Sequence, residues 1–163
     1  MSKKHRSAAR GKQRRKYEAS NASVYIVMAR TQTYTPEEQR KLQLPVYLAL
    51  DAMTAGTADA NDMGTLCRVC NVCLILGEQI GPVAVDVANE ALEALVRAEQ
   101  RLYQHGRYGL DGKGRNALTT CLDYHDQLIA ECTPAQLMEA QAEMHRRAAR
   151  GHAVRVTEEG VAA

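Results

Sequence analysis

The sequence predicts an all-α protein, an antiparallel bundle of four to five helices with a disordered basic N-terminal arm and at most one short terminal β-ribbon. Three observations support this prediction. Apolar residues recur at helical spacing between residues 35 and 150, capping residues precede these segments, and residues 1–16 are rich in Lys and Arg but contain no acid. We therefore expect a disordered arm at 1–20, a helical domain at 21–150 and a C-terminal tail at 151–163.

The composition is that of one ordinary globular domain with a tail. The chain has 163 residues, of which 45% are hydrophobic and 25% are charged. All seven aromatic residues are Tyr, so we expect a core of Leu, Val, Ile, Met, Ala and Cys. No stretch approaches the roughly 18 consecutive apolar residues that a membrane-spanning helix needs, and none is expected.

The first two helices are predicted from their capping residues. Residues 35–38 read Thr-Pro-Glu-Glu, a capping box that should begin a helix with a stop near Gly56. Pro45 falls inside this helix and should kink it, because proline removes one backbone hydrogen bond. Asp59 or Asn61 should cap a second helix that continues to about residue 80.

Three more helices follow. The Gly-Pro pair at 81–82 should begin the third, which ends at Gly106. A glycine-rich loop at residues 106–114 should precede a fourth helix that begins at about Arg115. Residues 133–136 repeat the capping pattern and should begin a fifth helix, which fades at about Arg150.

Two segments have strand character. Ser23–Ala29 is rich in β-branched residues, and a short strand and a buried helical turn are both open for it. His152–Thr157 alternates apolar and polar residues near the other end. The two could pair as a small ribbon that joins the termini, supported by the helices behind it.

The strongest functional feature is the charge of the N-terminal arm. The net charge of +2 is the sum of two unlike parts. Residues 1–16 carry a charge of +8, and the remaining 147 residues hold 13 bases and 19 acids. Lys and Arg at this density bind phosphate backbones largely without reading sequence. The predicted nucleic-acid contacts in the arm are Lys3, Lys4, Arg6, Arg10, Lys12, Arg14, Arg15 and Lys16.

The loop before the fourth helix offers a secondary contact. It places Arg107, Lys113 and Arg115 among glycines directly before a helix N-terminus, where exposed amides and the helix dipole favour an anion. Tyr108 could stack on a base. The alternative is a connector that needs glycine only for its turns.

The cysteines are expected to be reduced thiols in the core. Cys67, Cys70 and Cys73 have the spacing that begins a bacterial iron–sulfur motif, but the fourth Cys and its Pro are missing. On a helix the three thiols form a sloping row on one face, which suits packing better than a tetrahedral metal. We predict no cofactor, with a metal or redox role as the alternative. Cys121 or Cys132 could complete a site only if the fourth helix lies beside the second.

No catalytic constellation is recognised. Asp123–Asp126 reads Asp-Tyr-His-Asp, but neighbours on a helix point about 100° apart and cannot converge on one substrate. His125 shares the apolar face of its helix and should be a core or groove histidine. We therefore expect a protein that is not an enzyme and acts by binding.

Two parts of the sequence resemble a known group. The opening Met1–Ser7, and Tyr103–Gly112 followed by the helix around Leu118–Leu128, resemble segments of small helical proteins from temperate bacteriophages and prophages. The similarity covers residues 1–7 and 90–130 and carries over no activity. It implies an accessory protein of a mobile element, and such proteins commonly bind host machinery or nucleic acid.

The sequence thus predicts a cytoplasmic accessory protein that binds nucleic acid or a ribonucleoprotein through its arm. One alternative is a protein-directed inhibitor or adaptor of host machinery that uses the acidic helical surface, on which Glu90 and Glu93 should face outward. Neither reading involves a membrane, and a homodimer is an alternative to a monomer.

Overall fold

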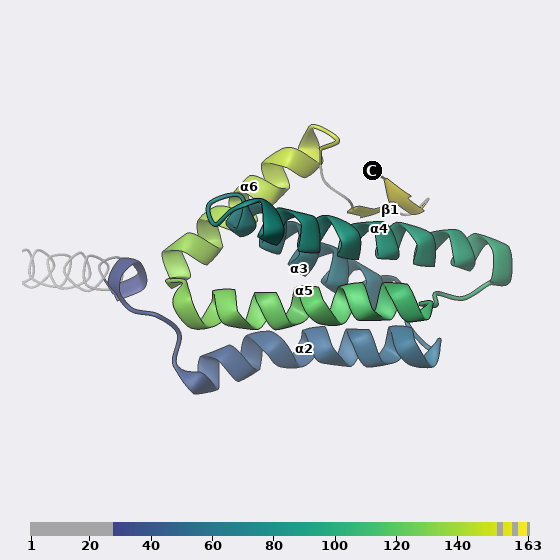
Figure 1. Ribbon diagram of the computed structural model, residues 1–163, viewed down its shortest axis with the longest axis horizontal. Coiled ribbons are helices and arrows are strands. Elements are labelled where there is room, and N and C mark those ends of the chain that lie inside the picture. Colours follow the sequence, from purple (N-terminus) through teal and green to yellow (C-terminus); the bar gives the residue numbers. More distant parts are fainter. Residues whose placement is uncertain (1–27, 153–154, 158–159, 163) are drawn as a thin grey trace, which may run out of the picture.

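The computed structural model describes residues 28–152, 155–157 and 160–162, and the prediction of an all-helical body is confirmed over residues 28–149. The predicted arm lies outside the described residues. Residues 28–31 are helical, and two short strands follow the helices. The elements are α2 (Pro36–Ala55), α3 (Ala60–Gly77), α4 (Pro82–His105), α5 (Gly112–Glu131), α6 (Pro134–Ala149), β1 (Arg155–Thr157) and β2 (Gly160–Ala162) (Figure 1).

Local side-chain chemistry sets the helix starts. The Thr35 hydroxyl accepts from the Glu38 amide at 3.4 Å, and the Glu38 carboxylate accepts from the Thr35 amide at 2.9 Å. Asp59, rather than Asn61, caps α3 in the same reciprocal way, and Thr133 does so for α6. Each cap satisfies amides that the first helical turn would otherwise leave without partners.

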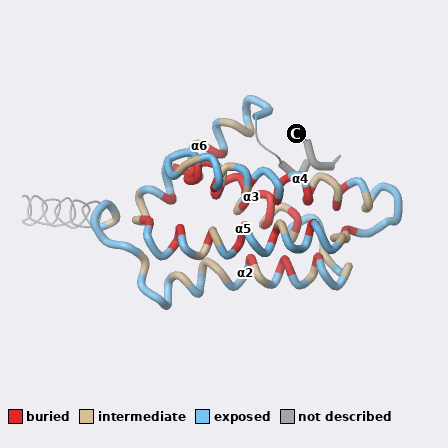
Figure 2. Tube along the Cα trace, in the orientation of Figure 1, coloured by how far each residue is buried: buried red, intermediate tan, exposed pale blue. Residues whose placement is uncertain are grey.

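Helix α3 is the centre of the fold. It packs against α2, α4, α5 and α6. Ten of its 18 residues are buried, and Figure 2 shows buried positions along it while α2 and α5 keep an exposed side. A helix covered by neighbours on several sides needs apolar or small residues around most of its circumference, and α3 meets this need with Leu, Val, Met, Ile and three Cys.

Two predicted helix boundaries are corrected. Helix α3 ends at Gly77, where the Gly77 carbonyl accepts from the amides of Ile80 and Gly81, and Ile80 lies exposed in the turn. Helix α5 begins at Gly112, three residues before the predicted start, because the Asp111 carboxylate caps it by accepting from the Gly114 amide at 2.6 Å.

Pro45 lies inside α2, which continues through it as one helix to Ala55. At the end of α2, Gly56 has φ +72°, and Gly106 has the same angle at the end of α4. This left-handed conformation strains other residues and is the usual helix stop that glycine provides.

The predicted terminal ribbon is corrected in its pairing. The strand predicted within His152–Thr157 is present as β1, but it pairs antiparallel with β2, with Val156 opposite Val161. The segment expected to pair with it ends in the helical residues 28 and 29, and residues 23–27 lie outside the described chain.

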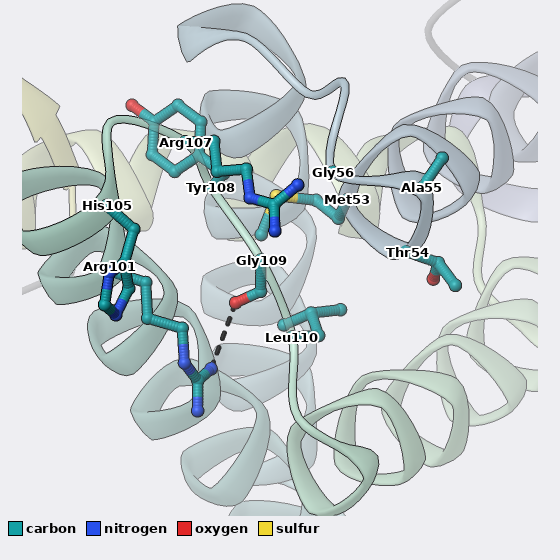
Figure 3. A pocket seen from close by; sticks show the side chains of 10 residues that line it. All are labelled: Met53, Thr54, Ala55, Gly56, Arg101, His105, Arg107, Tyr108, Gly109 and Leu110. Carbon is teal, nitrogen blue, oxygen red and sulfur yellow. Dashed lines mark hydrogen bonds between the residues drawn. The ribbon is translucent and has the colours of Figure 1, made fainter.

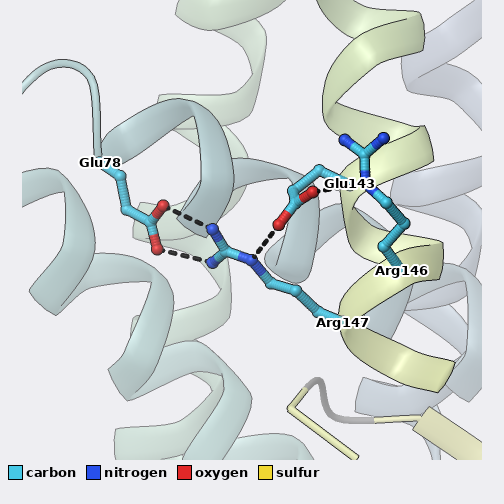
Figure 4. A network of polar contacts seen from close by, with 4 residues as sticks. All are labelled: Glu78, Glu143, Arg146 and Arg147. Atoms are coloured by element: carbon cyan, nitrogen blue, oxygen red, sulfur yellow. Dashed lines mark hydrogen bonds and ion pairs between the residues drawn. The ribbon is translucent and has the colours of Figure 1, made fainter. Parts of the chain in front are cut away.

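An ion-pair network fastens α6 to the end of α3 (Figure 4). The Arg147 guanidinium donates to both carboxylate oxygens of Glu78, at 2.6 and 2.8 Å, and its Nε donates to Glu143 at 3.0 Å. Arg146 also pairs with Glu143. The hydrogen bonds from Arg147 lower the pKa of both carboxyl groups.

Candidate nucleic-acid interface

The start of the described chain and the loop with three candidate cations lie at opposite ends of the helical body. The eight predicted arm residues, Lys3 to Lys16, lie outside the described residues. The described chain begins at Met28, beside the N-terminal end of α2, whereas the loop between α4 and α5 lies at the far end (Figure 1). The length of the body between these two ends is about 30 Å, as for a 20-residue helix such as α2.

The three loop cations do not form one cluster. All are exposed, but Arg107 lines a cavity beside the end of α2, and Lys113 lines a separate surface hollow that it shares with Glu90. Arg115 follows Lys113 by two residues, which places it about 200° around α5. The structure therefore separates these cations rather than gathering them.

Arg107 lies in a cavity of about 340 Å³ that Figure 3 shows from close by. Arg101 and His105 also line it, and no Asp or Glu is among its described lining residues. The C-terminus of α2 borders the same space at Gly56, and a helix C-terminus carries the equivalent of roughly half a negative charge. Arg107 Nη1 would stand 3.7 Å from a Cβ added at Gly56, which places this guanidinium beside the end of α2.

The N-terminus of α5, predicted to attract an external anion, already has a carboxylate. Asp111 accepts from the Gly114 amide and from Arg101 Nη2, both at 2.6 Å. Arg101 also donates to the Gly109 carbonyl at 3.0 Å (Figure 3). Gly114 lies against Ala94, where an added Cβ would stand 3.3 Å from the alanine Cβ, so this glycine permits close packing of α5 on α4. Asp three residues before Gly114 was the sequence signal for this cap.

Tyr108 does not stack on a base, because it is 6% exposed and belongs to the core. Its hydroxyl is hydrogen-bonded to Glu99, a buried carboxylate of α4. Burial, together with the Glu99 charge, raises the pKa of Tyr108 to about 12. The expectation of stacking fails because a tyrosine between glycines is folded inward by a tertiary partner that local sequence does not reveal.

Comparison with protein-family models, curated proteins and solved structures gives no match to this chain. None of the described helices combines the length and apolarity that crossing a membrane requires.

The cysteines are buried thiols, and the three cysteines of α3 face two different helices, α4 and α5. Cys67 lies near Glu99 of α4, and burial raises the pKa of its thiol to about 12. Cys70 and Cys73 face α5 instead: Cys70 Sγ lies 3.8 Å from Cys121 Sγ, and Cys73 Sγ lies 4.0 Å from the Cys121 carbonyl oxygen. The helix that carries Cys121 thus does lie beside α3. Within the described chain, however, no group of three or more Cys, His, Asp or Glu side chains is arranged to hold a metal ion.

His125 is buried, as predicted for a core or groove histidine, and the structure adds a polar partner. Its Nδ1 lies 3.4 Å from Asp126 Oδ1, and the Tyr47 hydroxyl donates to Asp126 Oδ2 at 2.7 Å. Burial lowers the pKa of His125 against the opposing effect of Asp126. The imidazole is therefore uncharged at neutral pH, and the Tyr47–Asp126 contact joins α2 to α5.

Proposed function

We propose that this chain is a non-enzymatic accessory protein of a phage or other mobile element, and that it binds nucleic acid or a ribonucleoprotein through residues 1–16. The observation that carries the proposal is the uneven charge. Residues 1–16 hold eight Lys and Arg and no acid, whereas residues 28–152 hold 12 bases and 16 acids, a net charge of −4. A polyanion is attracted by the first segment and repelled on average by the second.

The described helices favour residues 1–16 as the main phosphate-binding segment. Their exposed loop cations are dispersed, and Arg107 lies beside the C-terminus of α2. Arg101 and Arg147 are ion-paired. We therefore assign the main phosphate contacts to the arm and a secondary role to Arg107, Lys113 and Arg115.

A salt titration tests this assignment. The logarithm of the affinity for a DNA duplex should fall with the logarithm of salt concentration, with a slope of up to about 7 if all eight arm cations contact phosphates. A full-length variant with the eight arm residues changed to Gln should lose most of the affinity and most of the slope. The matched control changes Arg107, Lys113 and Arg115 to Gln and should lower the slope by at most about three.

A second control keeps the composition of residues 1–16 but scrambles their order, and it should bind as the natural chain does. Binding and slope that are unchanged by neutralising the arm would refute the proposal. The same measurements with single-stranded DNA and RNA define the preferred nucleic acid.

The adaptor alternative is favoured by one observation on α4. Asp86, Glu90 and Glu93 are exposed at a spacing that places them on one stripe, although Glu93 also lies 3.8 Å from Arg97. If this stripe binds a basic host protein, changing Glu90 and Glu93 to Lys should abolish capture of that protein. Capture should then survive nuclease treatment and neutralisation of the arm.

A further inference from the structure

A narrow cavity of about 230 Å³ lies where four helices meet. Its wall is formed by side chains of α2, α3, α5 and α6. Four of these side chains are buried and form an apolar floor, namely Val46, Val72, Ile129 and Leu137. Leu42, Pro45 and Val69 extend the apolar wall.

The polar lining of the cavity is positive or neutral. Lys41 and Arg68 line it and are exposed, so they lie on its solvent side. Thr65, Gln141 and the buried His125 complete the lining, and no Asp or Glu is among the described residues there. Because His125 is held by Asp126 and is uncharged at neutral pH, the positive charge is confined to the mouth.

The two cations at the mouth differ in what they already bind. Lys41 pairs with Glu37 at 2.8 Å, one turn earlier on α2 and outside the cavity. Arg68 has no hydrogen-bond or ion-pair partner among the described residues, although acidic residues outnumber basic ones in this part of the chain. A planar guanidinium at the edge of an apolar cavity is suited to a carboxylate, which it can bind through two parallel hydrogen bonds.

We propose that this cavity binds a small aliphatic carboxylate, with its hydrocarbon chain on the apolar floor and its carboxylate on Arg68. A volume of about 230 Å³ gives room for a short hydrocarbon chain. The floor contains no aromatic side chain, so an aliphatic body fits it better than a ring that needs stacking. This site is independent of nucleic-acid binding by the arm.

Isothermal titration calorimetry with sodium hexanoate tests the proposal on the full-length protein at constant ionic strength. We expect saturable one-site binding with a dissociation constant on the order of 1 mM, as suits so small a ligand. Hexanol keeps the body but lacks the charge, acetate keeps the charge but lacks the body, and hexylammonium reverses the charge. Each should bind at least about tenfold more weakly than hexanoate.

Variants locate the binding. Arg68→Gln should weaken hexanoate binding by about tenfold, because it removes the charged half of a charge-assisted hydrogen bond. Arg40→Gln is the matched control, since Arg40 is an exposed arginine of α2 that does not line the cavity. It should leave the affinity unchanged. Both substitutions are at exposed positions, and circular dichroism should show the same helical content for each.

Three results would overturn the proposal. The first is that hexanoate gives no saturable heat at concentrations of tens of millimolar. Hexylammonium or acetate could bind as well as hexanoate. Arg40→Gln could weaken binding as much as Arg68→Gln, which would mean a general surface-charge effect.

Discussion

The close packing of α3 on α4 makes a quantitative prediction about two glycines of the same helix. A Cβ added at Gly77 would stand 3.1 Å from the Ala84 Cβ and 3.2 Å from the Ala84 carbonyl carbon, whereas one added at Gly64 would meet nothing within 4 Å. Both residues belong to α3, so both substitutions by Ala gain helix propensity. Only the substitution at Gly77 creates a steric conflict.

The magnitudes set the signs of the two effects. Gly→Ala inside a helix is worth up to about 1 kcal/mol, and the gain is smaller at the last residue, which Gly77 is. Overpacking a buried contact costs about 1–3 kcal/mol, and Ala84, which is only 2% exposed, would have to shift by a few tenths of an ångström within the core. Gly64→Ala should therefore stabilise the protein by about 0.5–1 kcal/mol, and Gly77→Ala should destabilise it by about 1 kcal/mol.

Urea unfolding followed by far-ultraviolet circular dichroism measures both changes in the free energy of unfolding. The midpoint should rise for Gly64→Ala and fall for Gly77→Ala, with no change in the dependence on urea. Adding Ala84→Gly to Gly77→Ala should return part of the loss, because it removes one of the two conflicting atoms. If Gly77→Ala stabilised the protein as much as Gly64→Ala does, α4 would not approach α3 as closely as described.

Three further predictions concern polar contacts. Arg147→Gln should lower the free energy of unfolding by about 1 kcal/mol, the upper end for partly exposed ion pairs, and high salt should shrink the loss in urea titrations. Asp111→Ala should lower the melting temperature at neutral pH. The Gly114 amide and Arg101 lower the pKa of Asp111. The contribution of Asp111 to stability is therefore present above about pH 4 and is lost as the pH falls through that lowered pKa. A difference between the melting curves that stays constant into acid would contradict this. Tyr108→Phe should cost about 1–3 kcal/mol, because the buried Glu99 carboxylate loses a donor. In the folded protein, burial raises the pKa of both Tyr47 and Tyr108 to about 12. An absorbance titration of Tyr108→Phe should therefore show one fewer tyrosine that ionises in this range.

The helix boundaries could be predicted wherever a side chain acts on its own backbone. Thr35, Asp59 and Thr133 cap helices through atoms two or three residues away, and Gly56 and Gly106 end them through their own φ angles. These interactions are local and leave a pattern in the sequence. The all-helical class followed from the same local signals.

The candidate site was less predictable because its contacts are tertiary. Arg101 reaches Asp111 across a loop, and Tyr108 reaches Glu99 on the preceding helix. A glycine-rich, basic segment has the same sequence pattern whether it binds an external anion or its own carboxylate. The pattern thus predicted the residue types that anion binding needs, and the fold decides which of them remain available.

The charge distribution follows the same logic. Some cations of the described body have a carboxylate partner nearby, as Arg147 and Arg101 do. Folding selects such partners, because an unbalanced charge in a partly buried position is costly. Residues 1–16 hold eight Lys and Arg and no acid, so these cations have no carboxylate close by in the sequence. A nucleic acid can balance them and release its own counterions, which favours this segment over the helices for the main phosphate contacts.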